Sequence, residues 1–229
     1  RDSENLEFNH DQGFGITVYV GQRKGSCSTT DSSAEAIRET VAAAKRIATY
    51  TQDDDCNGLA DIELSPSELP DLDLYHPWEV NPEALTEMAQ ACEASALGVD
   101  QRITNTEGAQ VNTGQSVRVY GNTNGFVGSY ASTRYGLSCV VIGEDNTGMQ
   151  RDYWYTSSRD HKLLETAEQV GKRAGERTIE RLNPRKAPTG QFPVVFSAQV
   201  ASGLFGHLTG AISGGCLLYT SDAADEVSW

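Results

Sequence analysis

The sequence lacks several features that would place it in familiar classes of protein. No stretch approaches the roughly 18 consecutive apolar residues that a membrane-spanning helix needs, and residues 1–10 contain no apolar run typical of a signal peptide. Basic residues are scarce: 18 Lys and Arg stand against 32 Asp and Glu, for a net charge of −14. Because nucleic acids and anionic membranes are bound by clustered cations, this balance disfavours both as ligands. We therefore expect a cytoplasmic protein that binds neither.

Motifs of metal and nucleophilic sites are missing as well. The four His are isolated, and neither H-E-x-x-H nor C-x-x-C occurs, so no zinc site is predicted within the chain. The strained serine turn G-x-S-x-G is also absent. Asp53, Asp55 and Asn57 match the start of an EF-hand loop, but Leu64 occupies the position that needs a bidentate Glu. An Asx-rich connecting loop is the simpler interpretation.

Cysteines and aromatic residues give weaker indications. The five Cys are irregularly spaced, which favours reduced structural thiols, and Cys139 lies in an apolar run that predicts a buried position. Charged and aromatic residues alternate over Arg151–Tyr155. On a strand, such a strip either contacts a peptide or covers a face of a sheet, and the sequence leaves both open.

Local patterns predict the first half of the chain in some detail. Strands at 14–20 and 26–30 flank a Gly-bounded turn, which indicates a hairpin. A capping box from Ser32 to Glu35 and apolar residues at helical spacing predict a helix over about 33–50. An Asp- and Pro-rich loop follows over 51–80, and Asn81-Pro82 then begins a helix that ends near Leu97.

The second half reads as strands followed by helices. Residues 101–158 are dense in Thr, Val, Tyr and Gly and are punctuated by turn sequences at 122–125 and 144–148, which predicts four or five antiparallel strands. A helix is expected over about 162–182, a buried strand over 192–197 and a Gly-rich helix over 200–212. This order predicts an α+β fold with a mixed or antiparallel sheet and several helices.

The two ends of the chain have unusual sequences. Arg1 stands where an initiator Met would be expected, so we expect the N-terminus to be incomplete. Residues 216–229 begin with an eleven-residue run that resembles the translation of a transposon-end sequencing adapter. We therefore expect this segment to be foreign to the fold.

Four segments, in this order along the chain, together resemble the TldD/PmbA metallopeptidase family: Arg102–Gly108, Arg151–Tyr155, Arg181–Lys186 and Gly203–Gly215. The resemblance spans essentially all of residues 1–215 and is nearer to the PmbA-like branch, whose members are also described as modulators of DNA gyrase. It implies the N-terminal domain of a two-domain subunit, with residues 1–190 forming the N-terminal and central α+β region. Residues 191–215 would then be the truncated start of a C-terminal domain.

The resemblance also implies a function. In this family a TldD-like catalytic subunit and a PmbA-like subunit pair into a cytoplasmic zinc metallopeptidase that degrades or processes unfolded peptides. Its zinc motif, H-E-x-x-x-H, would fall on residues 206–211, where Gly206 and Ala211 replace the two ligands and His207 replaces the Glu. The resemblance therefore implies that this chain has no catalytic or metal-binding residue and is the non-catalytic partner, with zinc held by the other subunit.

The small residues Gly203, Gly206 and Gly210, with His207, suit close helix packing and mark a candidate interface.

Two alternatives to the function implied by the resemblance remain open. The first alternative to the peptidase subunit is a non-enzymatic interaction module whose acidic surface binds a basic protein partner. The second is a homodimer of the complete protein that is active by itself.

Overall fold

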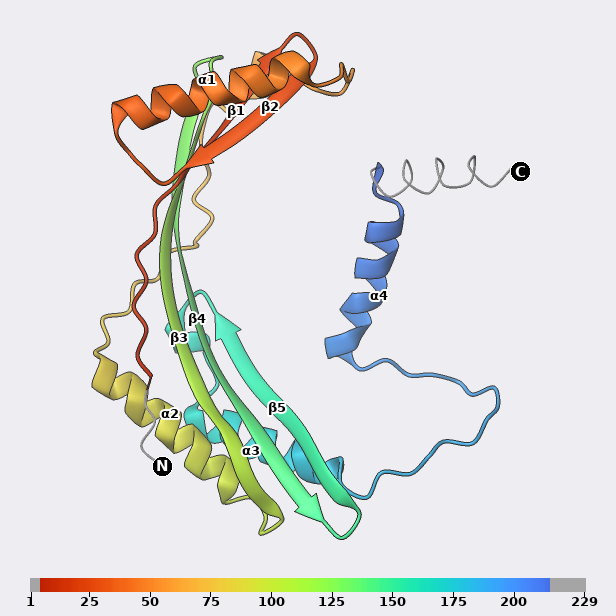
Figure 1. The fold of residues 1–229 in the computed structure, drawn as a ribbon. Helices are drawn as coiled ribbons and strands as arrows, with labels where there is room; N and C mark the ends of the chain where they lie inside the picture. Colours follow the sequence, from red (N-terminus) through yellow and green to blue (C-terminus); the bar gives the residue numbers. More distant parts are fainter. Residues whose placement is uncertain (1–4, 215–229) are drawn as a thin grey trace. The chain divides into compact units, whose positions relative to one another are not determined.

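The first compact element is a hairpin with a helix on one face. In the computed structural model, which describes residues 5–214, β1 (Phe14–Val20) pairs antiparallel with β2 (Arg23–Thr29), and α1 (Ala34–Tyr50) packs against both (Figure 1). The predicted hairpin and helix are confirmed. Two details of the prediction were wrong: the second strand begins three residues earlier, and the residue that caps α1 is Ser33, whose hydroxyl accepts from the Ala36 amide.

Close packing of α1 on the hairpin depends on small residues. Ala44 and Ala48 are fully buried at the contact. A Cβ atom at Gly25 of β2 would lie 2.1 Å from the Ala44 carbonyl oxygen, so only glycine permits this approach. The helix therefore lies almost directly on the strand backbone.

The predicted loop between the two helices is confirmed. Residues 51–81 contain only a short 3-10 turn, Ile62–Leu64. The end of this loop is held against the large sheet, because the Thr133 amide donates to the Leu74 carbonyl (2.9 Å) and the Tyr135 hydroxyl donates to the His76 carbonyl (2.8 Å). The end of the loop, although it has no regular secondary structure, is thus hydrogen-bonded to the second, larger sheet described next.

A second, larger sheet has three strands in the order β3-β4-β5. The strands are β3 (Ile103–Gly121), β4 (Val127–Asp145) and β5 (Gly148–Ser158) (Figure 1). Four or five strands were predicted, and this was wrong because β3 and β4 each run for 19 residues without a break. The two predicted turns are correct, and Gly125 and Gly148 adopt positive φ there.

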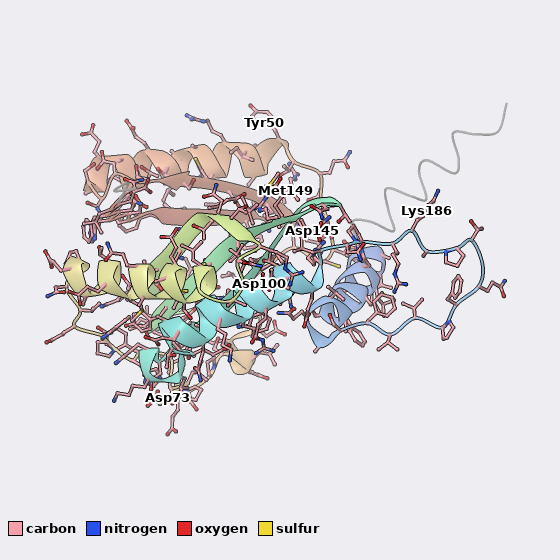
Figure 2. All side chains as sticks on the ribbon, turned by 90° about the horizontal axis from the view of Figure 1, so that it is seen from below. Tyr50, Asp73, Asp100, Asp145, Met149 and Lys186 are labelled. Atoms are coloured by element: carbon pink, nitrogen blue, oxygen red, sulfur yellow. The ribbon has the colours of Figure 1, made fainter. Side chains whose placement is uncertain are left out.

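Two helices cover one face of this sheet. α2 (Pro82–Leu97) and α3 (Ala167–Glu180) lie side by side against it (Figures 1 and 2). The bounds of α2 match the prediction. The expected helix from residue 162 was wrong at its start: His161–Leu163 is a separate 3-10 turn, and Thr166 caps α3 in a capping box with Gln169.

The core lies between these helices and the sheet. Its buried members come from α2, α3 and all three strands: Cys92, Ala96, Ile103, Leu137, Cys139, Val141, Trp154, Val170 and Ala174. The predicted buried position of Cys139 is confirmed. The adjacent Cys139 thiol, together with burial, raises the pKa of Cys92 above its ordinary value, so this thiol stays protonated and unreactive.

Residues 185–214 form a separate unit from residues 5–184. The helix predicted over 200–212 is confirmed as α4 (Ala198–Ala211). The buried strand predicted over 192–197 was wrong, since that segment is irregular and Val195 is 94% exposed. A strand needs a partner for its backbone hydrogen bonds, and within residues 5–214 no strand pairs with this segment.

The α+β fold class is confirmed, and the mixed or antiparallel sheet of the prediction is found as two antiparallel sheets. The adapter-like segment at residues 216–229 lies outside the described residues. Within residues 5–214, no helix combines the length and the apolar character required to cross a membrane.

Candidate functional site

The residues of the candidate interface and of the positions where the zinc motif would fall all lie on α4. Gly203, Gly206 and Gly210 are spaced by three and four residues, so they form a stripe along one side of the helix. Their flanking residues His207 and Ala211 are exposed. A Cβ atom at any of the three glycines would meet nothing within 4 Å among the described residues. Their role as an interface therefore stays a prediction.

This helix does not fit a zinc site. Gly206 and Ala211 carry no donor atom, which leaves the His207 imidazole as the one side chain able to bind zinc at the positions of the family motif. Among residues 5–214, no three His, Cys, Asp or Glu side chains come together in a way that could hold a metal ion. We therefore derive no chemical step through a metal on this chain.

The alternating strip at 151–155 is divided between the two faces of the large sheet. Asp152 and Trp154 of β5 are buried on the face covered by α2 and α3, whereas Arg151, Tyr153 and Tyr155 are exposed on the opposite face. We call that opposite face, formed by β3, β4 and β5, the open face. The buried half thus covers a face of the sheet, which is one of the two alternatives left by the sequence, and contact of the exposed half with a peptide stays a prediction.

The buried half of the strip attaches α3 to the sheet. Asp152 forms ion pairs with Arg177 (3.3 Å) and Arg181 (3.4 Å). The Arg173 guanidinium lies 3.7 Å from the centre of the Trp154 ring, and the indole N–H donates to Glu165 (3.1 Å). These contacts hold a helix in place and use up the hydrogen-bonding capacity of the buried residues.

The exposed half of the strip presents aromatic rings to solvent. Tyr153 and Tyr155 stack with their ring centres 6.2 Å apart and are each about half exposed. Arg151 pairs with Glu107 of β3 (3.0 Å), which neutralises both charges at this end of the open face. Exposed stacked aromatic side chains are typical of surfaces that bind another molecule.

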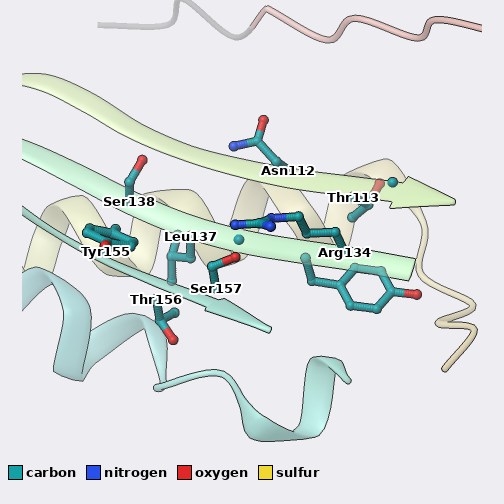
Figure 3. Close-up of a pocket in the computed structure, with 11 residues that line it drawn as sticks. Asn112, Thr113, Arg134, Leu137, Ser138, Tyr155, Thr156 and Ser157 are labelled. Atoms are coloured by element: carbon teal, nitrogen blue, oxygen red, sulfur yellow. The ribbon is translucent and has the colours of Figure 1, made fainter. Parts of the chain in front are cut away.

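A shallow hollow of about 530 Å³ lies on the sheet next to the Tyr155 ring (Figure 3). It forms because Gly136 stands between Arg134 and Ser138 on the open face of β4 and has no side chain to fill the space. Its rim is mostly polar: Asn112, Thr113, Arg134, Ser138, Tyr155 and Ser157.

Arg134 was not singled out by the sequence. It is exposed, and its guanidinium has no ion pair or hydrogen bond within residues 5–214. Arg134 lines the same hollow as Tyr155 because β4 pairs with β5 in a register that sets Tyr155 opposite Ser138, four residues along β4 from Arg134. Alternation along β4 could have assigned Arg134 to the face away from the core, but not to this hollow.

Family models match two parts of the chain. PmbA/TldA metallopeptidase domain 1 matches residues 4–48, which contain the hairpin and most of α1. The central domain of the same family matches residues 75–182, which contain α2, the three-stranded sheet and α3. One match therefore covers the hairpin with α1, and the other covers the three-stranded sheet with α2 and α3.

Individual relatives agree with these matches. The chain is 52% identical to Metalloprotease PmbA of Escherichia coli O157:H7 over 93% of its own length and 47% of that protein. It is 45% identical to a homologue in Haemophilus influenzae over 95% of its own length and 48% of that protein. The chain thus spans about half the length of the curated relatives it matches.

Solved structures show the same fold. A Bacteroides thetaiotaomicron protein described as a modulator of DNA gyrase superimposes with a TM-score of 0.80 and 29% identity, over 90% of this chain and 47% of that one. TldE from Thermococcus kodakarensis superimposes with a TM-score of 0.58 and 16% identity, over 72% of this chain and 37% of that one. The family models, the sequence relatives and the Bacteroides structure show that the chain belongs to the PmbA/TldD metallopeptidase family.

Proposed function

We propose that this chain is part of the non-catalytic, PmbA-like subunit of a cytoplasmic metallopeptidase that cleaves unfolded peptides. A TldD-like subunit would hold the zinc and perform amide hydrolysis. This chain would supply peptide-contacting surface and the interface with that subunit. Residues 1–190 would be its N-terminal and central region, and residues 191–215 the start of its C-terminal domain.

One observation carries the proposal. At the positions where the family's zinc motif would fall, α4 presents Gly206 and Ala211, neither of which has a side-chain donor. A catalytic zinc site needs about three protein ligands and a group that activates water, and this segment offers a single imidazole. A chain that keeps the family fold without these ligands is suited to a supporting role.

The open face favours the peptidase subunit over the alternative interaction module. A module that binds a basic protein should present carboxylates on its exposed sheet. Residues 108–143, which form most of β3 and β4, contain two Arg and no Asp or Glu. The carboxylates of the open face lie at its other end, where Glu107 is paired with Arg151 and Glu144 is exposed, so the stretch over residues 108–143 does not suit a basic partner.

A reconstitution assay tests the proposal. We expect the full-length protein alone to cleave an unfolded, fluorescently quenched peptide no faster than buffer. Mixed with a TldD-like protein from the same genome, it should raise cleavage by that protein about 10-fold or more, since a completed site orients the substrate. A matched control uses the TldD-like protein with its motif Glu changed to Gln, which should abolish cleavage in the mixture.

Two results would contradict the proposal. Cleavage by the full-length protein alone at the rate of the mixture would favour an active homodimer. Cleavage by the TldD-like protein that is unchanged by adding this protein would favour the separate interaction module.

A further inference from the structure

We infer that the open face binds an extended, acidic peptide segment, with a peptide carboxylate on Arg134 and an apolar peptide side chain on Tyr155. This inference deepens the proposed function and rests on it for the choice of a peptide as occupant. It adds the chemical class of the peptide and the two side chains that select it.

Charge is the first argument. The chain as a whole is strongly acidic, yet the 36 residues from Gly108 to Gly143 contain no carboxylate and two cations, Arg118 and Arg134. In the paired strands, Gly114 lies opposite Arg134, and Tyr130 lies opposite Arg118, so both cations lie on one face of the β3–β4 ribbon. This stretch of the open face is positive and carries no carboxylate of its own, because the carboxylates of the face, Glu144 and the Arg151-paired Glu107, lie at its other end. A positive stretch on an acidic protein attracts an anionic segment.

The hollow beside Arg134 supplies the second argument. A guanidinium presents a planar fork of N–H donors that matches a carboxylate, and the donors of Arg134 are not used by any described residue. Because Gly136 leaves the floor of the hollow at the level of the backbone, a peptide carboxylate can approach the guanidinium without displacing a side chain. The polar rim, with Asn112 and Ser157, suits a peptide backbone.

Spacing is the third argument. Tyr155 pairs with Ser138, four residues along β4 from Arg134, which corresponds to about 13 Å of extended strand. An extended peptide places the side chains of residues i and i+4 on one face at this same distance. A carboxylate on Arg134 and an apolar side chain on Tyr155 therefore require four-residue spacing in the bound peptide.

A nucleic acid is the other polyanion that combines charge with flat rings. Its affinity would come mainly from several phosphates neutralised together, and the net charge of −14 opposes that. The open face offers only two cations without partners among residues 5–214, which suits one or two carboxylates better than a phosphate backbone.

Fluorescence anisotropy with the full chain tests the inference. The probe is a labelled eleven-residue Gly/Ser/Thr peptide with a glutamate at its fourth position and a leucine at its eighth. We expect Arg134→Gln to weaken binding of this peptide about tenfold, because the substitution removes a charge-assisted hydrogen-bonded pair. Arg46→Gln, which removes the same charge from an exposed position on α1, should leave binding unchanged.

Two altered peptides complete the design. A lysine at the fourth position should abolish binding, and moving the leucine to the seventh position, on the opposite face of the peptide, should weaken it to the level measured with Tyr155→Ala. Circular dichroism of each variant shows that the fold is retained, which the exposure of Arg134 and Tyr155 favours.

Four results would overturn the inference: no binding of the acidic peptide, equal binding of the acidic and lysine peptides, no effect of Arg134→Gln, or tighter Arg134-dependent binding of a single-stranded oligonucleotide. None of them involves zinc or cleavage. The reconstitution assay therefore judges the subunit role separately from this inference.

Discussion

Replacing Gly171 by alanine is expected to lower the free energy of unfolding by about 2 kcal/mol. A Cβ atom there would lie 2.0 Å from the carbonyl oxygen of Cys92 on α2, and a backbone atom cannot rotate away as a side chain can. Overpacking of this kind costs about 3 kcal/mol, of which the better helix propensity of alanine recovers about 1 kcal/mol. Urea denaturation followed by circular dichroism measures the difference.

A matched substitution separates packing from helix propensity. Gly203 of α4 has nothing within 4 Å of its Cβ position among the described residues, so Gly203→Ala gains propensity without a clash. We expect no loss of stability from it. Equal stability of Gly171→Ala and the unsubstituted chain would show that α2 and α3 do not approach as closely as described.

Replacing Trp154 by alanine is expected to cost about 3–5 kcal/mol of stability, the range for a large buried aromatic residue. Its ring is 9% exposed, belongs to the core between sheet and helices, and carries Arg173 on its face. The substitution removes that packing and also leaves Glu165 without the indole donor. Thermal and urea unfolding should both show the loss.

Tyr153, the neighbouring residue on β5, provides the control. It is 52% exposed on the open face, so Tyr153→Ala should cost less than about 1 kcal/mol, as surface substitutions usually do. If the two substitutions destabilised the chain equally, the assignment of the two faces of β5 would be wrong.

Local chemistry explains which elements could be predicted. The bounds of α2 follow from an Asn cap, a proline at the first helical position and a glycine at the end, all adjacent in sequence. The hairpin and its turn follow in the same way. The predicted strand count was too high because β3 and β4 are each 19 residues long, far longer than a typical strand, and Gly114 and Gly136 lie within them without ending the pairing.

Long-range pairing explains what could not be predicted. The strip at 151–155 was recognisable from its alternation, but Arg134 and Tyr155 line one hollow only because of the register of β4 and β5, which no local pattern encodes. The strand predicted over 192–197 was wrong for a related reason. The apolar composition of this segment indicates burial, but a strand also requires a second strand to pair with it, and none does so within residues 5–214.

The zinc content of the full-length protein, purified alone without chelator, tests the central claim most directly. Because Gly206 and Ala211 offer no ligand, we predict far less than one zinc per chain by elemental mass spectrometry after dialysis against metal-free buffer. The TldD-like protein, treated identically, should retain about one zinc per chain. One zinc per chain in this protein, together with peptide cleavage, would contradict its assignment as the non-catalytic subunit.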